Sequence, residues 1–200
     1  AREYTLADNF FMAAFGGSVI ANRTPGADAP GSAPKKKYPF KKSINQWAFP
    51  ADMPTLEALS RARQAGFEAF EPCVDENGCI GLDASDADLA AIRRDAESKG
   101  IELSSLACGL GWKYPLSSPD KKTRERGKEV VAKALRVAQR LGVDALLVVP
   151  GVVTPEVPYD VALENALLAL RDLVAEAEKA KVALALENVW NKFLLSPLEM

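Results

Sequence analysis

A repeated spacing of helix ends and apolar segments constrains the fold of this chain more than any other feature. Gly66, Gly100 and Gly142 each end a segment with helical spacing of apolar residues, and each directly precedes a short segment typical of a β-strand. The next helix-to-strand junction, at Lys181, follows Gly142 at a similar interval. This regular period suits repeated strand–helix units joined by right-handed crossovers, which build parallel sheets.

The pattern predicts five strands, separated by four helices. We expect strands over 43–49, 67–72, 101–108, 143–149 and 182–186. We expect helices over 54–65, 85–99, 118–141 and 159–181, with a further helix starting at Ser196. The strands over 143–149 and 182–186 are nearly continuous apolar runs, which is typical of strands that are buried on both faces.

Local signals support the helix starts and indicate the buried faces. Ser85 and Asp88 form a capping box, and the tripeptide beginning at Ser118 supplies an N-cap, a proline and an acid for the next helix. In the helix over 159–181, the expected buried stripe consists of leucines and a valine at helical spacing, namely Leu163, Leu167, Leu170 and Val174.

Two architectures are compatible with this order of elements, an open doubly wound sheet and a (β/α)₈ barrel. No G-x-G-x-x-G motif follows a strand and no G-x-x-x-x-G-K-[ST] motif is present, so the sequence gives no support to a nucleotide site. The sequence therefore favours an α/β fold of the (β/α)₈ TIM-barrel type, with only about five βα units present.

The segment 1–41 differs from the rest of the chain in composition. Residues 10–21 are apolar and small, and 22–37 are rich in proline, glycine, alanine and serine before three lysines. We interpret 1–41 as an N-terminal arm and linker and 42–200 as a partial TIM-barrel domain. If 10–21 is the remnant of a secretory signal, the protein is periplasmic or exported. The acidic residues before it favour a cytoplasmic protein instead.

Composition excludes several classes of function. The chain has 25 Lys+Arg against 27 Asp+Glu, so we expect no nucleic-acid partner. No apolar run approaches the length of a membrane span, so we expect no membrane partner. The chain contains no histidine, which excludes Ser-His-Asp and Cys-His catalysis and histidine-containing zinc sites within it.

Functional side chains gather at the carboxyl ends of the strands in both architectures. Glu187 directly follows an apolar strand, where a carboxylate is costly unless it is paired, hydrogen-bonded or bound to a cation. Two explanations stay open for Glu187, a metal ligand or general base and a structural ion pair with Lys192 or an arginine. Glu71 ends the second strand and is a candidate for catalysis or substrate binding, with a simple rim charge as the alternative.

The remaining candidates are aromatic or basic. Trp47 and Trp112 lie near strand ends, where an aromatic ring can cover the apolar face of a sugar or can simply cap the core. Lys113 and Lys192 could bind a phosphate or carboxylate, and solvated surface positions are the alternative.

Several motifs, in their order along the chain, resemble a known superfamily. The segment ENVWNKF, from Glu187 to Phe193, resembles the one after the fifth strand in the sugar phosphate isomerase/epimerase superfamily. These proteins are xylose isomerase-like TIM barrels and include ketose 3-epimerases and hydroxypyruvate isomerases. The segments SINQWAFP, GFEAFEP and WKYPLSSPD resemble the first three units, so the resemblance covers roughly 42–200.

The resemblance implies a metal-dependent isomerase or epimerase that acts on a sugar or keto acid through an enediolate. In such proteins the glutamate that Glu187 matches binds a divalent cation, usually Mn, with Mg, Co or Zn as alternatives, and also moves a proton. Asn191 and Lys192 would lie in the loop that contacts the substrate, and Trp47 and Trp112 would wall the pocket. The family's other metal ligands, an aspartate, a histidine and a second glutamate, lie on later strands that this sequence does not contain.

Two alternatives accompany this interpretation. A zinc phosphodiesterase on the same barrel is disfavoured, because such sites are rich in histidine. A non-catalytic carbohydrate-binding module, or an incomplete scaffold module, stays open because a partial barrel exposes sheet edges. The expected partner is a small sugar or sugar-like molecule, and self-association into a homo-oligomer is left open.

Overall fold

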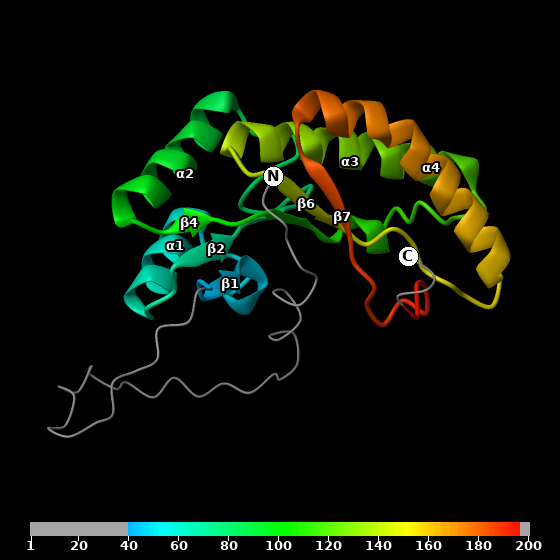
Figure 1. Cartoon of the computed structure of the whole chain (residues 1–200), viewed down its shortest axis with the longest axis horizontal. Coiled ribbons are helices and arrows are strands. Elements are labelled where there is room, and N and C mark those ends of the chain that lie inside the picture. Colours follow the sequence, from blue (N-terminus) through cyan, green and yellow to red (C-terminus); the bar gives the residue numbers. More distant parts are fainter. Residues whose placement is uncertain (1–39, 197–200) are drawn as a thin grey trace, which may run out of the picture. The chain divides into compact units, whose positions relative to one another are not determined.

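Strands and helices alternate along residues 40–196, which are the residues that the computed structural model describes (Figure 1). The strands are β1 (Ser43–Asn45), β2 (Ala69–Glu71), β3 (Cys73–Val74), β4 (Glu102–Leu103), β5 (Leu106–Cys108), β6 (Ala145–Val148) and β7 (Ala183–Leu186). The α-helices are α1 (Thr55–Gln64), α2 (Asp86–Lys99), α3 (Lys121–Leu141) and α4 (Tyr159–Ala180), and the short 3₁₀-helices are η2 (Gln46–Ala48) and η3 (Gly109–Trp112). This order confirms the repeated strand–helix units.

The strands form parallel ladders in the order β1-β2-β4 and β3-β5-β6-β7. Backbone bonds continue the strand pairing on both sides of the break between the ladders, because Ser104 N donates to Phe70 O at 3.0 Å and Ala107 N donates to Pro72 O at 2.9 Å. Pro72 has no N–H and separates β2 from β3. The pairs β2/β3 and β4/β5 therefore each act as one strand of the barrel, interrupted in the middle.

Helix caps agree with the sequence in one case and shift in another. Ser85 Oγ accepts a hydrogen bond from Asp88 N at 3.1 Å, which confirms the expected start of α2. The cap of α3 is Asp120, not Ser118, because the Asp120 carboxylate accepts from Thr123 N at 2.9 Å and Lys122 N at 3.3 Å. An aspartate satisfies two free N–H groups at once and also suits the helix dipole, so α3 starts after it.

The main core lies between the helices and one face of the strands. Phe70, Leu106, Leu146 and Val148 are buried in it, and Leu186 packs against it. Figure 1 shows α3 and α4 side by side, and they are in contact along their length. These helices cover the core side of the later strands.

Two strands that the sequence predicts to be buried on both faces are buried on one face only. In β7, Ala183 and Ala185 are exposed while Leu184 and Leu186 are half-buried against the core. In β6, Leu147 is likewise less buried than its neighbours. Within residues 40–196 β7 is the last strand of its sheet, so it has a strand partner on one side only.

The expected stripe on α4 is correct for two of its four residues. Leu163 and Leu170 pack against buried clusters, whereas Leu167 and Val174 are exposed. The fully buried residues of α4 are alanines and a leucine, namely Ala162, Ala166, Ala169 and Leu173. Apolar residues occupy more than one face of α4. Their helical spacing alone therefore does not show which face of the helix is buried. Small alanines face the neighbouring elements because they allow close helix packing.

Other expectations fall outside the described residues. Residues 1–39 of the predicted arm, which include the segment 10–21, and most of the helix expected from Ser196 lie outside the described residues. The boundary between arm and barrel stays a prediction. Among residues 40–196, no helix is both long enough and apolar enough to cross a membrane.

Gly111 provides a test of how η3 packs against the end of β6. A Cβ atom at Gly111 would lie 2.2 Å from Val149 O, so G111A forces two backbone segments apart. We expect G111A to lower the free energy of unfolding by about 1–3 kcal/mol in urea titrations. The control is G81A, because a Cβ there meets nothing closer than 4.0 Å. Equal stability of the two variants would contradict the packing described here.

Candidate active site

Strand alternation brings four polar side chains to the face opposite the helices. Neighbours in sequence point to opposite faces of a strand, and Ile44, Phe70, Leu106 and Leu186 all pack with the main core. The residues next to them therefore face away from the helices, and these are Asn45, Glu71, Ser105 and Glu187. Asn45 and Glu71 are the last residues of β1 and β2, and Glu187 directly follows β7. Ser105 lies between β4 and β5.

The first strand is shorter than expected, which makes Asn45 a strand-end residue. The strand ends at Asn45 and the chain turns into η2, because Asn45 Oδ1 accepts a hydrogen bond from Trp47 N at 2.6 Å. Asn45 is also the register partner of Glu71 on β2. The two side chains consequently lie next to each other on one face of the sheet.

Glu71 is held by hydrogen bonds from both sides. Asn45 Nδ2 donates to Glu71 Oε2 at 2.6 Å, and Ser105 Oγ donates to Glu71 Oε1 at 2.5 Å. Burial and the nearby Glu71 charge raise the pKa of the Cys73 thiol to about 12. Cys73 is therefore a neutral thiol, and its Sγ donates to Asn45 Oδ1 at 3.4 Å.

Glu187 lies directly after β7 and its backbone N donates to Val148 O at 3.0 Å. Its side chain is half-buried, and no hydrogen bond or ion pair links its carboxylate to another of residues 40–196. Burial raises the pKa of Glu187, and the negative charge of Glu71 raises it further. The proposed ion pair with Lys192 is absent from the described contacts, and Lys192 is exposed.

The three tryptophans lie in segments that follow the carboxyl ends of strands. Trp47 is 57% exposed, and its ring packs over Gly109, where a Cβ would lie 3.1 Å from Cζ2. Trp112, at the end of η3, contacts Trp190 with ring centroids 6.3 Å apart and planes at 44°. Loops after β1, β5 and β7 thus each contribute one exposed indole.

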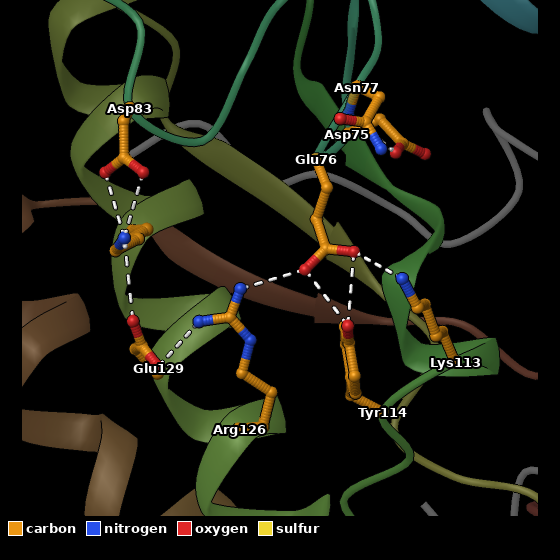
Figure 2. A network of polar contacts seen from close by, with 9 residues as sticks. Asp75, Glu76, Asn77, Asp83, Lys113, Tyr114, Arg126 and Glu129 are labelled. Atoms are coloured by element: carbon orange, nitrogen blue, oxygen red, sulfur yellow. Dashed lines mark hydrogen bonds and ion pairs between the residues drawn. The ribbon is translucent and has the colours of Figure 1, made fainter.

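Lys113 points toward Glu76, as Figure 2 shows. Lys113 Nζ donates to Glu76 Oε2 at 2.6 Å, Arg126 Nη2 donates to Oε1 at 2.8 Å, and the Tyr114 hydroxyl donates to the same carboxylate at 3.0 Å. Hydrogen bonds from Lys113 and then Arg126 lower the pKa of Glu76 to about 2. The charge of Lys113 is therefore balanced by a partner within the chain.

Asn191 is fully buried and anchors the loop after β7. Its Nδ2 donates to Gly151 O at 2.7 Å, and its Oδ1 accepts from Val189 N at 3.2 Å and Phe193 N at 3.4 Å. Lys192 follows with a positive φ of 56° and an exposed side chain. The Asn191 side chain thus fixes the shape of the segment that carries Glu187 and Trp190.

The model of the xylose isomerase-like TIM barrel family matches residues 59–199. The chain belongs to this family. The match confirms the (β/α)₈ fold that the sequence favours over an open sheet, and it confirms the resemblance drawn from the strand-end motifs.

Several xylose isomerase-like relatives of this chain are named as sugar epimerases. An L-ribulose-5-phosphate 3-epimerase of Salmonella paratyphi B is 30% identical over 150 residues, which are 72% of this chain and 51% of that protein. D-psicose 3-epimerase of Clostridium cellulolyticum H10 matches with a TM-score of 0.65 and 18% identity, over 75% of this chain and 53% of that one. An L-ribulose 3-epimerase matches with a TM-score of 0.62 and 22% identity, over 74% and 50%.

The chain spans about half the length of the curated relatives that it matches. The structural neighbours have low sequence identity to this chain and support the fold alone. The family match over 59–199 therefore assigns the chain to the xylose isomerase-like TIM barrels.

Sequence reasoning missed several residues of this site. Trp190 lies inside the motif that carries Glu187, and its position shortly after that glutamate was the available signal. Asn45 and Ser105 were missed because the first and third strands were expected to continue through them. Glu76 was missed because its partners come from a loop and a helix far along the chain.

The Glu76 network predicts a specific pH dependence of stability. The pKa of Glu76 falls from 4.5 to about 2 in the folded chain, so its contribution is complete above pH 4.5 and is lost as the pH falls toward 2. We expect E76Q to unfold at a lower temperature than the wild type at pH 7, with the difference closing between pH 4.5 and 2.

The control for this experiment is E57Q, which removes an exposed ion pair with Arg61 and should change the melting temperature little at any pH. A difference between E76Q and the wild type that stays constant from pH 7 to pH 2 would contradict the account of this network.

Proposed function

We propose that this chain contributes to a metal-dependent isomerase or epimerase that moves a proton next to the carbonyl of a ketose. One observation carries the proposal, the half-buried Glu187 carboxylate at a strand end, which has no partner among residues 40–196 and a raised pKa. A base with a raised proton affinity is better suited to accept a proton from carbon near neutral pH. The family match supports the same reaction class.

Glu187 is the proposed catalytic residue. Its carboxylate would take the proton from the carbon beside the carbonyl to leave an enediolate, and a second group would return a proton to another carbon or the other face. The raised pKa favours this step, because a more basic carboxylate accepts a proton from carbon more readily.

A divalent cation fits Glu187 as one of its ligands. Mn is the first candidate, with Mg, Co or Zn as alternatives, and when bound it would polarise the carbonyl and the neighbouring hydroxyl. The free carboxylate oxygens of Glu187 are ligands of the type that a hard cation prefers. Within residues 40–196 no cluster of three or more His, Cys, Asp or Glu could hold a metal, so Glu187 supplies one ligand and not a whole site.

The proposed partner is a small sugar, without nucleic acid or membrane and with a homo-oligomer left open. Trp47 and Trp112 would cover the apolar face of the sugar ring. Substrate contacts by Lys113, Asn191 and Lys192 also stay predictions. A substrate would have to compete with Glu76 for the Lys113 ammonium group. The side-chain amide of Asn191 already donates to Gly151 O.

The proposal is tested by E187Q, with E97Q as the matched control. Glu97 is an exposed carboxylate on α2, and its side chain is 67% exposed. With Mn²⁺ added, we expect wild type and E97Q to convert a ketose to its epimer or isomer and to bind Mn²⁺. We expect E187Q to lose conversion by at least about a hundredfold and to bind Mn²⁺ more weakly. Conversion and ketose binding are followed by NMR, and Mn²⁺ binding by electron paramagnetic resonance.

Two outcomes would contradict the proposal. Unchanged conversion and Mn²⁺ binding by E187Q would remove Glu187 from the site. Ketose binding by the wild type with no conversion would favour the alternative, a non-catalytic carbohydrate-binding or scaffold module.

A further inference from the structure

We infer that Glu71 is a fixed hydrogen-bond acceptor for hydroxyl groups of the substrate, with Asn45 and Ser105 as its positioning residues. This inference rests on the proposed function, because it concerns the same sugar site. It adds one acceptor and two positioning residues from other strand positions.

The orientation of the Glu71 carboxylate is fixed by donors from two neighbouring strand positions. Asn45 and Ser105 each bond one of its oxygens, at 2.6 and 2.5 Å, and bonds to a charged acceptor are among the strongest in proteins. A carboxylate offers about four acceptor positions, so two donors leave about two for a ligand. A carboxylate held in this way loses little entropy when a sugar hydroxyl binds.

The orientation of Asn45 is fixed in turn. Its Oδ1 accepts from Trp47 N at 2.6 Å and from Cys73 Sγ at 3.4 Å, which leaves Nδ2 to face Glu71. One amide thus connects the turn that carries Trp47 with the acceptor on β2. The position of an exposed indole and the direction of a carboxylate depend on the same side chain.

The remaining acceptor positions of Glu71 are open to neutral donors. Among residues 40–196 no lysine or arginine forms an ion pair with Glu71, and Lys113 is engaged by Glu76. Sugar hydroxyls can therefore donate to the positions that Asn45 and Ser105 leave free.

The decisive variant is N45D/E71Q, which exchanges donor and acceptor. The new amide at 71 donates to the new carboxylate at 45, which still accepts from Trp47 N, so the contact is kept while the charge leaves position 71. We expect N45D alone to lower the melting temperature through repulsion with Glu71, and the double variant to recover most of that loss. We expect the double variant nevertheless to bind L-ribulose at least about tenfold more weakly than the wild type.

The measurements are melting temperature, KM against kcat, and the Kd for L-ribulose with Mn²⁺ present. We expect S105A to raise KM more than it lowers kcat. Wild-type affinity in N45D/E71Q would show that Glu71 is only structural and would overturn the inference.

The same data separate this inference from the proposed function. A wild type that binds and converts L-ribulose, together with a double variant that binds it equally well, defeats the inference and leaves the proposed function intact. A wild type that does not bind L-ribulose contradicts both.

Discussion

The alternation of side chains along short parallel strands is the constraint on which the rest of this structure depends. Each strand buries one face under the helices, so its other face becomes a place where polar residues can gather. Ile44, Phe70 and Leu186 pack with the core, and the residue after each of them is polar. A shift of one residue in any of these strands would bury a carboxylate or an amide and expose an apolar side chain.

Loops at the carboxyl ends turn this alternation into a shaped site. The Asn191 amide bonds the loop after β6, and the close approach of Gly111 to Val149 O brings η3 against the end of the same strand. Lys113 and Glu76 join the loops after β5 and β3 by an ion pair. These contacts position the loops that carry Glu187 and the tryptophans. None of them involves the Glu187 carboxylate, which is left free to bind a ligand.

The order of elements could be predicted from the sequence because each repeat carries its own local signals. The glycines that end α2 and α3 adopt positive φ values of 61° and 80°, which is the conformation that their position after a helix predicts. Glu187 and Glu71 could be named as candidates because each lies at the carboxyl end of a predicted strand. The buried face of α4 could not be predicted, because Leu167 and Ala166 differ in neighbours that only the fold brings together.

The bonds around Glu71 also lay beyond sequence reasoning. They depend on a strand that ends at Asn45 rather than Phe49, and on a break between β4 and β5 that frees Ser105. Neither event has a strong local signal, because serine and asparagine occur both in strands and at their ends. Tertiary pairing of three strand positions, and not the propensity of any one, decides these boundaries.

The central claim is that this face of the sheet serves proton transfer at the carbon beside a ketose carbonyl. It is tested most directly by incubating the protein with Mn²⁺ and L-ribulose in D₂O and locating deuterium in the recovered sugars by NMR. The account predicts deuterium at the carbon next to the carbonyl, in step with the appearance of the epimer or isomer. Product that forms without deuterium at that carbon would contradict it.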